Sequence, residues 1–235
     1  MTAMTKGRMG RRAPTTHWPA GIRLSRDVPL APWSAASLWW AGPTTVTVLL
    51  VGLWLFGTGE ALLVAARLGT SPWTVLAVGI SRHTALSVGE ATLVISLALL
   101  AAWVPLRVRP GLGSIANAVV VALAIDVMGR VLPHPHAVAL RLIMVLVGIA
   151  FAGVGSGLYL TAALGPGPRD GWMTGLHRRF GWSVARVRFG IEAAALTAGW
   201  LLGGTVGVGT ALFAVLVGWA VALALGVVRA SATHR

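Results

Sequence analysis

The chain contains an internal duplication. Residues near 50–120 align without a gap on residues 96 positions further along, so that Leu68-Gly69 falls on Leu164-Gly165 and Pro72 on Pro168. Roughly 31% of the aligned positions are identical, well above the level expected for unrelated apolar sequence. Both copies are made of long apolar segments, an organisation shared by many transporters. The fold is therefore expected to consist of two related membrane units.

The composition indicates an integral membrane protein. Hydrophobic residues make up 56% of the chain and charged residues 11%, and the mean hydropathy is +0.80, whereas a soluble domain carries about 25% charged residues. The net charge of +13 comes from basic residues that flank the apolar segments, as cytoplasmic loops do. We therefore expect a lipid bilayer as partner and no nucleic acid.

Six segments are long enough to cross a bilayer, which takes about 20 residues. They lie at 44–66, 87–105, 112–131, 138–163, 184–202 and 207–228. Two shorter segments, 72–83 and 168–181, occupy equivalent places in the two copies, each after a turn containing glycine or serine followed by proline. We expect these two to be short interfacial or re-entrant helices.

The basic residues predict the topology. With six spans and both termini in the cytoplasm, only Arg67, Arg82, Arg130 and Arg141 face outward and the other 15 basic residues face inward. An eight-span arrangement gives the same distribution, so segment length decides for six. Three spans per copy make the halves inverted repeats. The expected fold class is thus an all-α membrane protein with two inverted three-helix repeats.

The expected domain organisation follows from these boundaries. Residues 1–37 are rich in arginine and proline and lack apolar periodicity, which predicts a disordered basic cytoplasmic arm. Residues 38–131 form the first repeat, 132–228 the second, and 229–235 a cytoplasmic tail.

The N-termini of the two short helices are candidate binding sites. Ser71-Pro72 and Gly167-Pro168 are favourable helix starts, and Arg169 and Asp170 follow in the first turn of the second one. Two helix N-termini dipping inward from opposite faces could hold an anionic group. The alternative is that they are well-capped interfacial helices without a ligand.

Acidic residues inside the spans are the sharpest chemical signal, because an unpaired charge at mid-bilayer costs about 2.5–3.5 kcal/mol or more. Arg188 and Glu192 are four residues apart, as are Asp126 and Arg130, so each pair is expected to form an ion pair on one helix face. Glu60 has no such neighbour. It is the strongest candidate for proton or cation coupling.

Glycines recur at equivalent places in the two copies. Small residues let helices approach closely in lipid, so packing is the primary interpretation and a flexible cavity lining the alternative. The expected packing positions are Gly57, Gly59, Gly153, Gly155, Gly157, Gly207 and Gly209.

No catalytic or metal-binding motif is evident. The chain lacks cysteine, and His134-Pro135-His136 is too small a cluster to predict a metal site. A nucleophile elbow, a phosphate-binding glycine loop and a zinc-protease motif are all missing from the sequence. We expect neither an enzyme nor a cofactor.

Several motifs resemble one known family. The segments 68–73 and 87–89, Gly165 to Met173, Arg188-x-x-x-Glu192 and the glycines of 202–210 resemble the bacterial YczE/YyaS/YitT membrane protein family over roughly residues 44–228. The resemblance implies a multi-pass protein of the bacterial plasma membrane and no established substrate. The long arginine-rich N-terminal arm departs from the family pattern.

Two functions remain open at this point. The first is a transporter-like protein that moves a small anionic or amphipathic solute between the repeats. The second is a non-transporting scaffold for a biosynthetic or secretion complex. The sequence also leaves self-association into a homo-oligomer open.

Overall fold

The structure is a computed structural model that describes residues 27–233. These residues form helices joined by short connections, and no strand occurs between residues 27 and 233. The helices are α1 (Pro43–Ala66), α2 (Pro72–His83), α3 (Val88–Ala101), α4 (Trp103–Leu106), α5 (Leu112–Val131), α6 (Val138–Thr161), α7 (Pro168–Phe180), α8 (Val184–Leu201) and α9 (Val208–Thr233). The expected all-α class is confirmed.

Five helical stretches are long and apolar enough to cross a membrane. They are α1, α3 together with α4, α5, α6 and α9. The sixth expected span, 184–202, forms α8 but does not reach the same hydrophobic level, because Arg186, Arg188 and Glu192 lie within its 18 residues. The expected span 87–105 is interrupted at Ala102, since Pro105 has no N–H to donate to the carbonyl one helical turn back.

The helix boundaries follow local signals. Proline opens α1, α2 and α7, where its missing N–H costs nothing. Ser87 and Ser183 accept hydrogen bonds from backbone N–H groups in the first turns of α3 and α8. The turns before α2 and α7 contain Gly69 (φ +107°) and Gly165 (φ +110°), backbone angles that disfavour any residue with a side chain.

The equivalent helices α1 and α6 pack on each other in antiparallel directions through glycines. Gly52 contacts the α6 backbone at Gly155, and Gly59 contacts it at Gly148. Gly52 aligns with Gly148 and Gly59 with Gly155, so the first contact becomes the second when the two copies are exchanged. This is the pattern of a two-fold contact between equivalent surfaces.

The turns before the short helices α2 and α7 make a second pair of contacts that become each other when the two copies are exchanged. The N–H of Gly209 donates to the Leu68 carbonyl at 2.7 Å, and the N–H of Gly113 donates to the Leu164 carbonyl at 2.8 Å. Each bond joins the start of one copy's last helix to the turn before the other copy's short helix. The two copies are thus interlocked.

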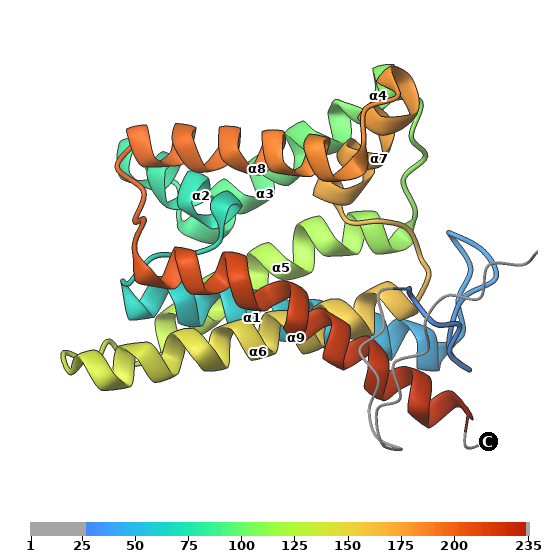
Figure 1. Cartoon of the computed structure of the whole chain (residues 1–235), viewed down its shortest axis with the longest axis horizontal. Helices are drawn as coiled ribbons and strands as arrows, with labels where there is room; N and C mark the ends of the chain where they lie inside the picture. Colours follow the sequence, from blue (N-terminus) through green and yellow to red (C-terminus); the bar gives the residue numbers. More distant parts are fainter. Residues whose placement is uncertain (1–26, 234–235) are drawn as a thin grey trace, which may run out of the picture.

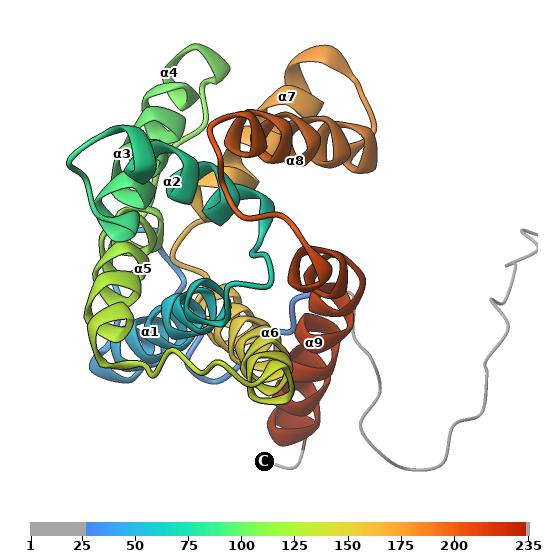
Figure 2. The same ribbon diagram turned by 90° about the vertical axis from the view of Figure 1, so that its left-hand side faces the viewer.

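The helices form an open ring. They pack in the order α9, α6, α1, α5, α3, α2 and α8, and α7 contacts α3, α4 and α8. Figure 2 shows this C-shaped arrangement, with α8 and α9 facing each other across its opening. The equivalent pair α3 and α5 packs closely, whereas α8 makes no comparable contact with α9. In Figure 1 the helices form an upper and a lower layer, with α8 in the upper one and α9 in the lower one.

The glycines expected at packing positions all lie at close contacts. A Cβ atom at Gly57 would collide with Ala124 of α5, and its equivalent Gly153 faces Ala220 of α9 in the same way. Gly157 lies against Ala224, and Gly207 and Gly209 lie against the turn at Leu68. Gly59 and Gly155 lie in the contact between α1 and α6. Together these contacts support the packing interpretation.

Both ends of the bundle differ from the expected boundaries. Residues 1–26 of the expected arm lie outside the described residues, but Ser34 donates to the Thr161 carbonyl at 2.7 Å and Ala35 donates to the Ala162 carbonyl at 3.0 Å. This segment therefore lies against the end of α6. The helix α9 continues to Thr233, through most of the expected tail.

Candidate functional site

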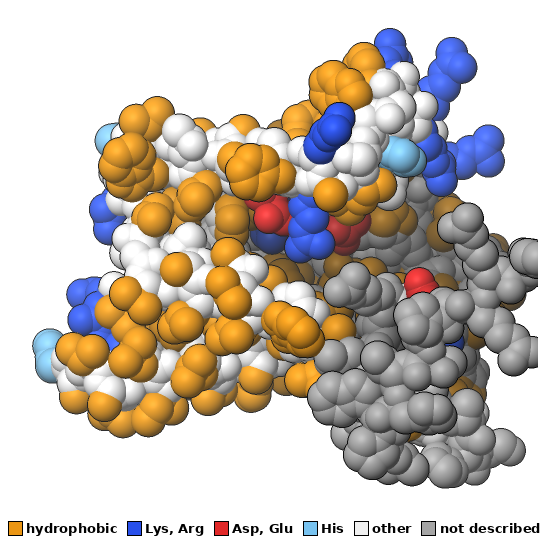
Figure 3. Space-filling view, viewed as in Figure 1, with side chains coloured by type: hydrophobic (Ala, Val, Ile, Leu, Met, Phe, Trp, Pro, Cys, Tyr) orange, Lys and Arg blue, Asp and Glu red, His pale blue; other side chains and the backbone are white. Residues whose placement is uncertain are grey.

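A cleft lies in the opening of the ring, between α8 and α9. Its volume is about 310 Å³, at the lower end of the range for small-molecule sites. Acidic and basic side chains are visible together in the recess between α8 and α9 (Figure 3). The N-terminal ends of both short helices line the cleft, through Ser71 to Trp73 of α2 and Gly167 to Asp170 of α7.

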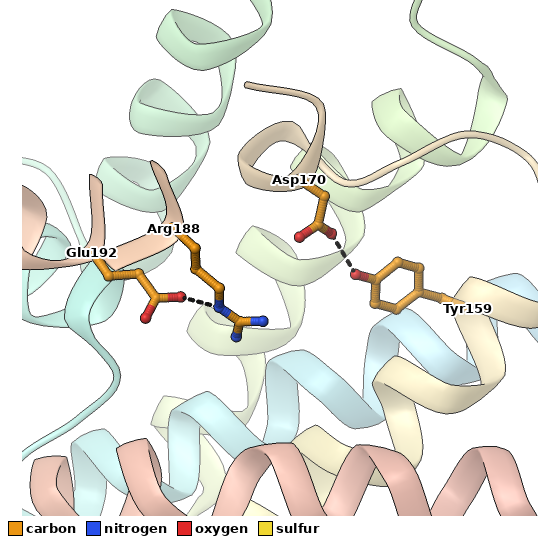
Figure 4. A network of polar contacts seen from close by, with 4 residues as sticks. All are labelled: Tyr159, Asp170, Arg188 and Glu192. Carbon is orange, nitrogen blue, oxygen red and sulfur yellow. Dashed lines mark hydrogen bonds and ion pairs between the residues drawn. The ribbon is translucent and has the colours of Figure 1, made fainter. Parts of the chain in front are cut away.

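Asp170 lies where polar groups from three helices meet. The hydroxyl of Tyr159 on α6 donates to Asp170 Oδ2 at 3.2 Å (Figure 4). A Cβ atom built on Gly167 would lie 3.3 Å from Asp170 Oδ2, 3.5 Å from Asn117 Nδ2 and 3.6 Å from the Tyr159 hydroxyl. The glycine therefore leaves room for these three groups to converge.

The surroundings of Asp170 shift its pKa. Desolvation by burial raises the pKa of Asp170, and the nearby Glu192 adds to this, while the hydrogen bond from Tyr159 and the charges of Arg169 and Arg188 oppose it. Burial is the largest of these effects, so the pKa lies above its usual range. Asp170 can consequently exchange a proton closer to neutral pH than an ordinary aspartate can.

Two arginines complete the polar lining. Arg188 Nε donates to Glu192 Oε1 at 3.0 Å, so the ion pair expected on α8 is confirmed. Arg169 lies over the Trp73 ring, with its guanidinium carbon 5.5 Å from the ring centre, a cation–π arrangement that joins the starts of α2 and α7. Two arginines, Asp170 and Glu192 thus give the cleft a balanced charge.

The wall opposite α8 is apolar. It is built from α9 by Phe213, Val217, Val221 and Leu225, with Gly218 and Ala222 between them. Phe56 of α1 and Met173 of α7 extend this surface. One side of the cleft can therefore accept hydrocarbon while the other offers charges and hydrogen bonds.

Glu60 lies behind the cleft wall. It is fully buried, and its Oε2 accepts hydrogen bonds from Ser71 Oγ at 2.8 Å and Thr74 Oγ1 at 2.7 Å. Its Oε1 has no hydrogen-bond partner. Ser71 lines the cleft, so one hydroxyl separates the carboxyl group from it.

Asp126 of α5 caps a neighbouring helix. Asp126 accepts hydrogen bonds from Ser87 Oγ at 2.5 Å and from the N–H of Gly89 at 2.8 Å, and so caps α3 from α5. The expected pair between Asp126 and Arg130 is wrong, because the Asp126 carboxylate bonds to the start of α3 and not to Arg130. The start of α3 offers two donors, which satisfy the Asp126 carboxylate instead.

Eight predicted site residues line the one cleft: Ser71, Pro72, Gly167, Pro168, Arg169, Asp170, Arg188 and Glu192. Glu60, the ninth, contacts it through Ser71. Sequence reasoning missed Tyr159, Asn117 and Thr74. Tyr159 and Asn117 are the single tyrosine and the single asparagine of the chain, and such isolated polar groups inside apolar spans were the available signal. No cluster of three or more histidine or acidic side chains that could hold a metal occurs in the described part of the chain.

Comparisons with known proteins agree with this membrane architecture. A family of unknown function, DUF6198, matches residues 43–225. The chain belongs to this family. An uncharacterized protein of Haemophilus influenzae is 42% identical over 203 residues, which cover 86% of this chain and 93% of the relative. The uncharacterized membrane protein YczE of Bacillus subtilis is 34% identical over 175 residues, covering 73% and 81%.

The expected resemblance to YczE is thereby confirmed, and the chain is a multi-helix membrane protein with bacterial relatives. No solved structure matches the chain.

Proposed function

We propose that this DUF6198 protein transports a small amphipathic solute through the cleft between α8 and α9. The observation that carries the proposal is the cleft itself, where the starts of both short helices meet two arginines and two acids inside a bundle of membrane-spanning helices. Charged groups at such a position mark substrate or ion pathways in membrane proteins. They are costly in a purely structural protein.

The chemistry of the cleft favours an amphipathic solute over a simple anion. Each short helix already has an acidic side chain at its N-terminal end, Glu60 at α2 and Asp170 at α7, which takes the place that the anion would occupy. Arg169 and Arg188 are balanced by Asp170 and Glu192. A solute with a zwitterionic or hydrogen-bonding head and a short apolar body matches both walls.

The pseudo-two-fold contacts support an inverted arrangement of the repeats. Because α1 and α6 are antiparallel, the two-fold axis that exchanges the two copies runs perpendicular to these helices. With both helices spanning the membrane, this axis lies in the membrane plane. Exchanging the conformations of the two copies would separate α3 from α5 and close α8 onto α9. The cleft would then open beside Thr92 and Ser96, the buried equivalents of Arg188 and Glu192. This gives alternating access, and with α8 as a sixth crossing both termini lie in the cytoplasm of a bacterial plasma membrane.

A cleft-filling variant tests the proposal. Gly218 lines the cleft, and neither Gly218 nor Gly190 on α8 has a neighbour within 4 Å of an added Cβ. Gly218→Phe should abolish uptake of a panel of small zwitterionic amphipaths into proteoliposomes, and the matched Gly190→Phe should leave it intact. Equal uptake by both variants would contradict transport through this cleft.

A membrane scaffold is the second candidate, favoured by the closely packed glycine contact between α1 and α6. A scaffold would bind a partner protein without moving any solute. In that case Gly218→Phe would leave the physiological phenotype unchanged, whereas substitutions on the exposed surface would alter it.

A further inference from the structure

The two repeats carry a carboxyl group at matching places, supplied by different helices. Glu60 on α1 bonds to Ser71 and Thr74 at the start of α2. The aligned residues of the second repeat are Ser156, Gly167 and Asp170, so the acid has moved from the long helix to the short one. Asp170 lines the cleft, while Glu60 is sealed behind it.

Glu60 is poorly satisfied as an ion. It has no ion-pair partner among the described residues, and the two hydroxyl donors both bond to Oε2, which leaves Oε1 buried without a partner. A fully buried carboxyl group with one unpaired oxygen leaves that oxygen free to carry a proton. Its position in the middle of the bundle excludes direct contact with bulk water, because its exposed area is zero.

We infer that Glu60 is a proton-binding site which exchanges with the cleft through the Ser71 hydroxyl. In one concerted relay the Ser71 hydroxyl takes a proton from a hydronium ion in the cleft while its own proton passes to Glu60 Oε2. The hydronium ion becomes water, the hydroxyl is restored, and one proton has moved from the cleft to Glu60. The use of this proton in transport rests on the proposed function, whereas its binding to Glu60 does not.

The charged groups of the helices around Glu60 lie in the cavities on either side of it, beyond the residues that contact its carboxyl group. Across Ser71 and Trp73 the cleft carries Arg169, Asp170, Arg188 and Glu192. On the other side a second cavity of about 240 Å³ brings Asp126, Arg130 and His134 against the α1 surface that begins at Ala61. At the end of α1, Arg141 of α6 donates to the Ala66 carbonyl at 2.6 Å. None of these charged groups forms an ion pair with Glu60.

Infrared spectroscopy of the full-length protein in liposomes tests the inference without a known solute. The carbonyl stretch of a protonated carboxyl group is separate from the amide bands, and its pH titration counts buried acids. Wild type should show one titrating component for Glu60 and one for Asp170. Glu60→Gln should remove one component, and Glu90→Gln, a matched control at an exposed capping carboxyl, should keep both. Ser71→Ala should shift the band, because it removes one hydrogen bond.

Other outcomes overturn the inference. An unchanged band in Glu60→Gln, or a wild-type band that responds to sodium at constant pH, would show that Glu60 does not serve as a proton site. A melting curve of each variant verifies folding, and Ser71→Ala provides the same test if Glu60→Gln does not fold. If the band behaves as expected while Gly218→Phe leaves uptake unaffected, the proton site stands and the transport route fails.

Discussion

The glycine crossing of α1 and α6 makes a quantitative prediction about stability. A Cβ atom at Gly59 would lie 2.5 Å from the Gly148 carbonyl oxygen and 2.7 Å from the Ala152 nitrogen. Ordinary contacts begin at 3.4 Å, so Gly59→Ala must push the two helices apart by about 1 Å. Overpacking of this kind costs about 1–3 kcal/mol.

The matched control is Gly190→Ala on α8, where nothing lies within 4 Å of the added atom. Both variants gain the same helix propensity, about 1 kcal/mol relative to glycine, so their difference isolates the packing cost. For a protein of this size each kcal/mol lowers the melting temperature by about 2–4 °C.

Thermal unfolding in detergent, followed by tryptophan fluorescence, measures this difference. Gly59→Ala should melt below Gly190→Ala, and Gly155→Ala should match Gly59→Ala because the two glycines are equivalent under exchange of the repeats. Equal melting of Gly59→Ala and Gly190→Ala would refute the close crossing of α1 and α6.

Three further predictions concern the acids. The pKa of Asp170 is raised, so just above the ordinary aspartate value of about 4 the folded state binds more protons than the unfolded state. The stability of wild type should therefore fall as the pH rises through that window. Asp170→Asn should flatten the dependence of the melting temperature on pH. Asp126→Ala should destabilise the folded protein by about 1–3 kcal/mol, because it leaves the N–H of Gly89 and the Ser87 hydroxyl unpaired. A melting temperature equal to that of wild type would contradict the capping role. Arg188 and Glu192 are 58% and 38% exposed, so a double-mutant cycle should give a coupling below about 1 kcal/mol, and a much larger value would show that lipid or a ligand desolvates the pair.

The duplication predicted most of the helices, since the turns before the short helices and the starts of the long ones recur in both copies. The short helix 72–83 was predicted at its observed bounds, and α5 likewise. The local signals were strong at α2, which has proline at its first position and Ser71 as the N-cap residue before it. The interruption at Ala102 was missed although Pro105 provided the signal.

The candidate site was only partly predictable. The starts of both short helices and the α8 ion pair were identified, because their chemistry is visible within a few residues. The contacts of Glu60 were not, because they depend on how α2 folds back on α1 across the intervening turn. Aligning the copies compares Glu60 with Ser156 and so hides the match between the Glu60 carboxyl group and Asp170.

The opening between α8 and α9 could not be predicted from the repeats. The duplicated pattern treats α8 as the equivalent of α3, and α3 packs on α5. The difference lies in the side chains, since Arg188 and Glu192 replace Thr92 and Ser96, and charged groups resist burial against the apolar face of α9.

Single-cysteine labelling of the loops after α2 and α7 tests the inverted arrangement most directly. The chain has no cysteine of its own, and Thr84 and Phe180 are exposed, equivalent positions exactly one repeat apart. In intact cells a membrane-impermeant thiol reagent should label Thr84→Cys from outside and label Phe180→Cys only after the membrane is opened. Labelling of both positions from the same side would contradict two copies that cross the bilayer in opposite directions.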